Sequence, residues 1–122
     1  MKNVNRYVRA DGERFLKDTR NEYMMVDQRP YPGKIAEDGK VLIPSGAKAK
    51  LLILHDDGGV VDRNTGEIRD NELETIEVTI VGVDYPLPFE KKSKVRLEGF
   101  MPEISFVVGY DLILRFSGIE KL

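Results

Sequence analysis

Alternation of apolar and polar residues runs through most of the chain and predicts strands. The clearest case is the segment 75–84. Its apolar residues Ile76, Val78 and Ile80 alternate with polar ones, as in a strand that buries one face. Residues 47–55 alternate in their first half and are apolar on both faces in their second, which predicts a central strand. Further short strands are expected at residues 23–27, 40–43, 93–100, 105–108 and 112–116.

The polar stretch at residues 58–70 has the composition of a hairpin. Two β-prone pieces, 60–61 and 67–68, flank an Asn-x-Gly turn. Six or seven short strands with little helix predict an all-β protein, either a barrel or a sandwich. A five-stranded barrel with extra hairpins fits the length of the chain. We expect the barrel to form one domain over residues 23–122.

The polar segment 1–22 is expected to be an N-terminal arm. Asp11 could cap a short helix over Gly12–Asp18, with Glu13 in its first turn and Lys17 in its last. A helix of this length is stable only when it is docked on the rest of the protein.

Composition narrows the class of protein. The chain has 122 residues, 41% of them hydrophobic, which suits a single globular domain. It contains no cysteine, so neither disulfides nor thiolate metal sites can form, in keeping with a reducing cytoplasm. No apolar run reaches the roughly 18 residues of a membrane span, and no secretory signal is recognisable. We therefore expect a cytoplasmic protein without a membrane partner.

Two segments resemble reactive or metal-binding sites. His55 is the single histidine and stands beside Asp56 and Asp57, which could bind a metal or supply a base. A strand end entering an acidic loop explains the same residues. The segment from Asp62 resembles a calcium loop, but its twelfth position is Leu73 where a glutamate is required. We expect no catalytic residue, no metal and no cofactor, and hence a protein that is not an enzyme.

The densest basic cluster is Lys91–Arg96, which lies between Phe89 and Phe100. Cations for phosphates and aromatic faces for bases are what a groove for single-stranded nucleic acid requires. The net charge of −2 argues against such a function, because affinity for nucleic acid depends on phosphate neutralisation. Solubilising lysines and core phenylalanines would explain the same pattern. The candidate nucleic-acid-binding residues are Lys48, Lys50, Phe89, Lys91, Lys92, Lys94, Arg96, Phe100, Tyr110 and Arg115.

Three motifs occur in order over residues 58–120: Asp-Arg-x-Thr-Gly-Glu from Asp62, Val-x-Leu-x-Gly-Phe from Val95, and Leu-Arg-Phe-x-x-Ile from Leu114. In this half the chain resembles OB-fold-like, single-stranded-DNA-binding-type accessory proteins of Gram-positive conjugative plasmids and integrative elements. The resemblance implies an OB-like barrel, single-stranded DNA as partner, and a role in replication, transfer or maintenance of such an element. It also implies that residues 91–96 lie beside the binding face. The negative net charge and the arm depart from the pattern, and the arm could bind DNA or join protomers.

A protein-interaction module is the alternative. The acidic loop 56–74 could mimic nucleic acid or dock on a basic partner. A subunit of a transfer complex, or an inhibitor of a host defence protein, would fit this loop.

Overall fold

The computed structural model describes the backbone of residues 12–61, 68–108 and 111–122, and the side chains of residues 12–59, 70–105 and 113–122. Asp11, the turn at 62–67, the side chain of Phe106 and Tyr110 therefore lie outside the described residues. The elements are, in chain order, α1 (Gly12–Asp18), β1 (Tyr23–Tyr31), β2 (Lys34–Ile35), β3 (Val41–Ile43), β4 (Gly46–Ile53), β5 (Val60–Val61), β6 (Ile68–Arg69), β7 (Thr75–Val81), β8 (Lys94–Phe100), the 3-10 helix η2 (Pro102–Ile104), β9 (Phe106–Val108) and β10 (Asp111–Lys121).

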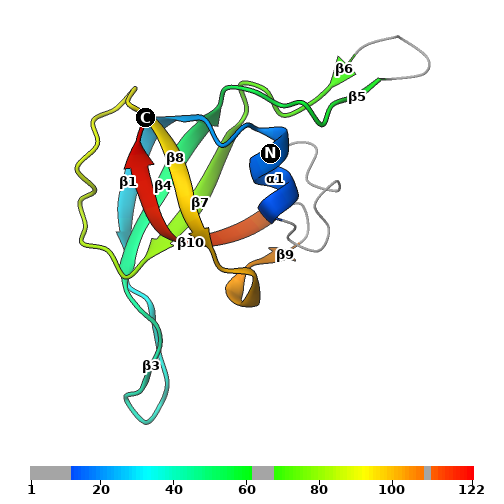
Figure 1. Cartoon of the computed structure of the whole chain (residues 1–122). Helices are drawn as coiled ribbons and strands as arrows, with labels where there is room; N and C mark the ends of the chain where they lie inside the picture. The colour runs from blue at the N-terminus through cyan, green and yellow to red at the C-terminus, as the bar shows by residue number, and fades with distance from the viewer. Residues whose placement is uncertain (1–11, 62–67, 109–110) are drawn as a thin grey trace.

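Five of the strands close into a barrel (Figure 1). Strand β4 pairs antiparallel with β1 and with β7. Strand β10 runs parallel to β7 and antiparallel to β8, and β8 closes the circle on the first residues of β1. A meander of three strands followed by a parallel contact between the third and fifth is the Greek-key arrangement of an OB fold. The prediction of a small OB-like barrel is confirmed.

Two hairpins extend from the barrel (Figure 1). The hairpin β5–β6 follows β4, as the sequence predicts for residues 58–70. A second hairpin, β2–β3, connects β1 to β4, where the sequence predicts only the strand at 40–43. The second hairpin was missed because β2 is only two residues long and carries too little pattern to be recognised.

The barrel interior is filled by the inward-pointing residues of the five strands. In β7, Ile76, Val78 and Ile80 belong to this core, so the predicted alternation is confirmed. The predicted helix Gly12–Asp18 also forms, and its Phe15 is fully buried in the same core. The Phe15 ring stacks on that of Tyr23, with 6.0 Å between the centroids. The short helix is thus stabilised by packing on the barrel.

Strand β1 is longer than the sequence suggests. The sequence predicts a strand only over residues 23–27, because the prolines and glycine at positions 30–33 are typical of a break, but pairing with β4 continues to Tyr31. Beyond Met25 no described strand pairs with the opposite edge of β1, so the N–H that Pro30 lacks is not needed there. The side-chain amide of Gln28 bonds to the backbone N–H and C=O of Leu87 instead, at 2.7 and 3.2 Å. This extension places Arg29 and Tyr31 in the sheet.

Candidate nucleic-acid interface

Strand β4 presents lysines to the outer surface of the barrel. Ala47, Ala49 and Leu51 are fully buried in the core. Since successive side chains of a strand point to opposite faces, Lys48 and Lys50 project outward.

Three basic residues align across the strands on this outer face. Arg29 of β1 is the register partner of Lys48. Lys48 is in turn the partner of Thr79 in β7, and Thr79 that of Arg115 in β10. Register partners point to the same face, and adjacent strands lie about 4.8 Å apart. We call Arg29, Lys48 and Arg115 the cationic row.

A second set of charged residues lies beside the row. Asp27, Lys50 and Glu77 are register partners across β1, β4 and β7. The Glu77 carboxylate accepts two hydrogen bonds from Arg29, at 2.6 Å from Nη2 and 3.2 Å from Nε. Its Oε1 also lies 4.0 Å from Nζ of Lys48. A small open pocket between the two sets is lined by Asp27, Gln28, Arg29, Lys48, Lys50 and Glu77.

A satellite core fixes one end of the cationic row. Tyr31, Ile43 and Val81 are buried together, with Met101 and Ile104 packed against them. These residues bring the base of hairpin β2–β3 and the η2 segment together over the ends of β1 and β7. In OB folds, ligands bind on the face of the second and third strands, which here are β4 and β7, between the loop that joins strands one and two and the loop that joins strands four and five. The cationic row crosses that face, with Lys48 on β4 and with Arg29 and Arg115 on the adjacent strands β1 and β10.

Tyr31 orients two members of the row. Nζ of Lys48 lies 5.7 Å from the centroid of the Tyr31 ring, and Cζ of Arg115 lies 6.0 Å from it. Cations at such distances are attracted by the ring face. Arg115 also donates from Nη1 to the carbonyl of Ile104. Because Arg115 is only 6% exposed, it contributes positive potential to the face, whereas Lys48 and Arg29 are accessible to a ligand.

The cluster Lys91–Arg96 lies elsewhere, on β8 and the connector before it. Lys91, Lys92, Lys94 and Arg96 are all exposed there. Nη2 of Arg96 is 2.6 Å from Glu120 and 3.4 Å from Glu98. Hydrogen bonding and Coulomb attraction to Glu120 raise the pKa of Arg96. Strand β8 pairs with β1 at Tyr23 and Met24, at the other end of that strand from Arg29, and Arg96 pairs with Glu120, five positions beyond Arg115 in β10, so this cluster is separate from the cationic row.

The two candidate aromatic residues that the structure describes, Phe89 and Phe100, pack inward. Phe89 and Phe100 are half-buried against the core, and the ring of Phe100 is 5.6 Å from that of Phe116.

Of the ten candidate residues, the structure brings Lys48, Lys50 and Arg115 onto one face. It adds Arg29 and Tyr31, which the sequence analysis missed. Arg29 and Tyr31 occupy alternate positions on either side of Pro30, as residues on one face of a strand do. This spacing was the only signal in the sequence that could have identified them.

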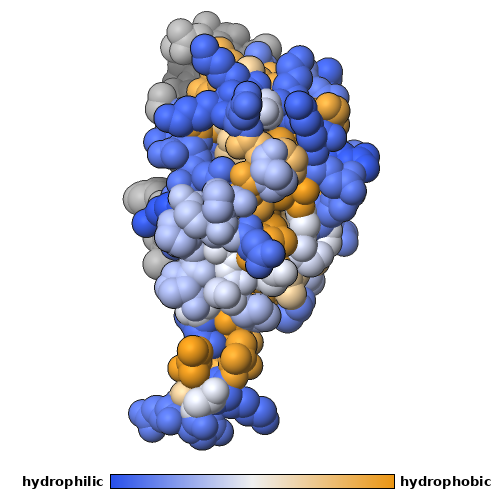
Figure 2. Space-filling model, turned by 90° about the vertical axis from the view of Figure 1, so that its left-hand side faces the viewer, coloured by the Kyte–Doolittle hydropathy of each residue, from blue (hydrophilic) through white to orange (hydrophobic). Residues whose placement is uncertain are grey.

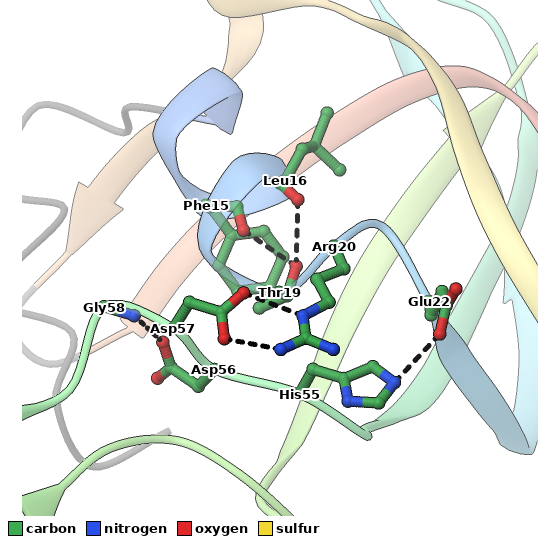
Figure 3. A network of polar contacts seen from close by, with 9 residues as sticks. All are labelled: Phe15, Leu16, Thr19, Arg20, Glu22, His55, Asp56, Asp57 and Gly58. Carbon is green, nitrogen blue, oxygen red and sulfur yellow. Dashed lines mark hydrogen bonds and ion pairs between the residues drawn. The ribbon is translucent and has the colours of Figure 1, made fainter.

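His55 and its acidic neighbours form a polar network that joins three parts of the chain (Figure 3). Nε2 of His55 is 2.8 Å from Glu22 at the start of β1. Asp57 makes two hydrogen bonds with Arg20, at 2.8 and 2.9 Å, and these bonds lower the pKa of its carboxyl group. Buried Asp56 accepts hydrogen bonds from the backbone N–H groups of Gly58 and Asn71. These contacts tie the end of α1 to the base of hairpin β5–β6.

Among the described residues, no three His, Cys, Asp or Glu side chains gather in a way that could hold a metal ion. That part of the chain also contains no helix with the length and hydropathy needed to cross a membrane.

No protein-family model, curated protein or solved structure matches this chain. Its class therefore rests on its own topology and surface. Together these define a small OB-like barrel with a row of cations on the face between its loops.

Proposed function

We propose that this chain is a non-enzymatic accessory protein that binds single-stranded nucleic acid through the cationic row and Lys50. The observation that supports the proposal is the alignment of Arg29, Lys48 and Arg115 across the loop-flanked face. Lysines and arginines in such a row that neutralise backbone phosphates release the counterions condensed on the nucleic acid, and this release favours binding. A local row of this kind is compatible with the net charge of −2, because Arg29, Lys48, Lys50 and Arg115 outnumber Asp27 and Glu77 on this face.

Binding of this kind is mainly electrostatic. Tyr31, the aromatic residue at the row, is only 8% exposed and is covered by the satellite core, so it offers little ring face to a base. The proposal therefore includes weak base preference and a strong dependence on salt. Single-stranded DNA as the ligand, and a role in replication, transfer or maintenance of a plasmid or mobile element, come from the motif resemblance and form part of the same proposal. The cytoplasmic location in the proposal comes from the composition of the chain.

The test compares two double variants that remove the same charge from different faces. Fluorescence anisotropy would measure binding of labelled oligo-dT from 20 mM to 300 mM salt. Each phosphate contact to a single strand changes the slope of log K against log salt concentration by about 0.7. Between 1 M and 50 mM salt, a slope change of this size corresponds to about an eightfold change in affinity. We expect Lys48→Ala with Lys50→Ala to lower affinity by about 65-fold at 50 mM salt and to reduce the slope by about 1.4.

Lys91→Ala with Lys92→Ala is the matched control and should change binding by less than threefold. Absence of oligo-dT binding by the wild type at 20 mM salt would refute the proposed function. A loss confined to the Lys91/Lys92 variant would instead assign binding to the β8 side of the barrel.

A protein-interaction module is the second candidate, and the hairpin β2–β3 favours it. Ile35, Val41 and Leu42 are 66%, 60% and 63% exposed, while the neighbouring Ile43 is anchored in the satellite core. Figure 2 shows this hairpin below the barrel, with hydrophobic residues near its base and a hydrophilic tip. Val41→Lys with Leu42→Lys should abolish capture of a protein partner and leave oligo-dT binding intact. The opposite result would favour the nucleic-acid proposal.

A further inference from the structure

The cationic row places like charges directly opposite each other. Arg29 and Lys48 are register partners on neighbouring strands, an arrangement that destabilises a sheet when nothing compensates it. Glu77 provides the compensation. It contacts both residues and is itself the register partner of Lys50. One carboxylate therefore contacts two of the cations that the proposed function assigns to phosphate and lies opposite a third.

The contact between Arg29 and Glu77 has the geometry of phosphate recognition. The guanidinium donates from Nη2 and Nε to the two carboxylate oxygens, at 2.6 and 3.2 Å. Arg binds carboxylates and phosphates with the same pair of parallel hydrogen bonds. The donors that a phosphate would use on Arg29 are thus occupied by a side chain of the same protein.

The pair is also exposed enough to be replaced. The side chains of Arg29 and Glu77 are 60% and 41% exposed. Exposed ion pairs are weak because water and salt screen them, so their exchange for another anion costs little. A carboxylate displaced by a phosphate would remain nearby as a like charge and oppose binding.

We infer that Glu77 is an internal competitor of the phosphate backbone for Arg29. Its carboxylate stabilises the free protein and limits both the affinity for single-stranded nucleic acid and the salt dependence of binding. This inference rests on the proposed function. It predicts that removing one negative charge at Glu77 strengthens binding far more than removing one elsewhere. A merely structural role for Glu77 would leave binding unchanged or weaken it.

Glu120 supplies a matched control for this test. Like Glu77, it is a glutamate on a strand that accepts two hydrogen bonds from an arginine, at 2.6 and 3.2 Å from Arg96. Its side chain is 49% exposed. Glu77→Gln and Glu120→Gln therefore change net charge equally and each weaken one arginine–glutamate pair, but on different faces of the barrel.

The experiment is a titration of labelled oligo-dT with both variants and the wild type at several salt concentrations. We expect Glu77→Gln to tighten binding about eightfold at 50 mM salt and to steepen the salt slope by about 0.7, the effect of one more phosphate contact. Glu120→Gln should stay within twofold of the wild type. The gain from Glu77→Gln should disappear when Arg29→Met is added. Circular dichroism would show that all variants fold, with a slightly lower thermal midpoint for Glu77→Gln.

Three outcomes would overturn the inference. Equal tightening by both variants would show a general effect of net charge. Wild-type binding that depends on Lys48 but is not tightened by Glu77→Gln would reject the competitor role and leave the proposed function standing. If neither the wild type nor Glu77→Gln binds at 20 mM salt, the proposed function itself fails, and the inference fails with it.

Discussion

A buried pair of hydroxyl groups joins helix α1 to the barrel and allows a quantitative test of the fold. Oγ1 of Thr19 lies 2.7 Å from the carbonyl of Phe15 and 2.6 Å from the hydroxyl of Tyr23. Thr19 and Tyr23 are both fully buried. Thr19 has one hydrogen to donate, and the Phe15 carbonyl receives it, so the Tyr23 hydroxyl donates to Thr19.

This direction of donation makes the two single substitutions unequal. Tyr23→Phe removes a donor but leaves the Thr19 hydroxyl bonded to Phe15, so we expect a loss of about 1 kcal/mol in unfolding free energy. Thr19→Val leaves the buried Tyr23 hydroxyl without its acceptor, and we expect about 2 kcal/mol. The Phe15 carbonyl remains bonded to the backbone N–H of residue 19 at 3.0 Å, so it adds no further cost.

Urea denaturation of the wild type, both single variants and the double variant measures the coupling between the two groups. With both polar groups gone, the double variant should lose about 1 kcal/mol less than the sum of the single losses. Additive losses, or a larger loss for Tyr23→Phe than for Thr19→Val, would refute the assignment of donor and acceptor.

The same pair predicts a response to alkaline pH. Burial raises the pKa of Tyr23 well above its usual range, and the hydrogen bond with Thr19 opposes this only in part. Because the unfolded chain releases the tyrosine proton near pH 10, the contribution of neutral Tyr23 to stability is complete below that pH and is lost as pH rises further. Tyr23→Phe should show a smaller decline in unfolding free energy between pH 9 and 11.

Two further predictions concern the contacts that hold the barrel together. Because Arg20 lowers the pKa of Asp57, their pair stabilises the fold above about pH 4 and the contribution is lost as pH falls; the thermal midpoint of Asp57→Asn should be below that of the wild type at pH 7 and equal to it at pH 2. Asn21, at φ +48°, exchanges two hydrogen bonds of 2.8 Å with the backbone of Leu97. Asn21→Ala should lower the unfolding free energy measured by urea denaturation by about 2 kcal/mol. Asn21→Gly relieves the backbone but lacks the amide, so it should recover only part of that loss. Full recovery would show that backbone strain alone matters.

Local pattern sufficed for the elements whose signal lies within a few residues. The alternation in β7 needs only neighbouring positions to be recognised, and the cap and charge pattern of Gly12–Asp18 predicted a helix in the same way. The number and spacing of such strands then predicted a barrel or a sandwich, and the motif resemblance implied the OB-like barrel with an extra hairpin that the structure has. Strand β1 was cut short because Pro30 is read as a breaker unless it is known that its edge of the strand is unpaired.

The sequence by itself determined the elements, the class of barrel and most of the candidate cations. Only the tertiary structure decided which of these cations share a face. Arg29, Lys48 and Arg115 are far apart in sequence and meet because the register of four strands aligns them. Arg96 and Glu120, also distant in sequence, pair across β8 and β10 for the same reason. Strand register depends on the burial of whole faces and on closure of the barrel, and no local window of sequence contains that information.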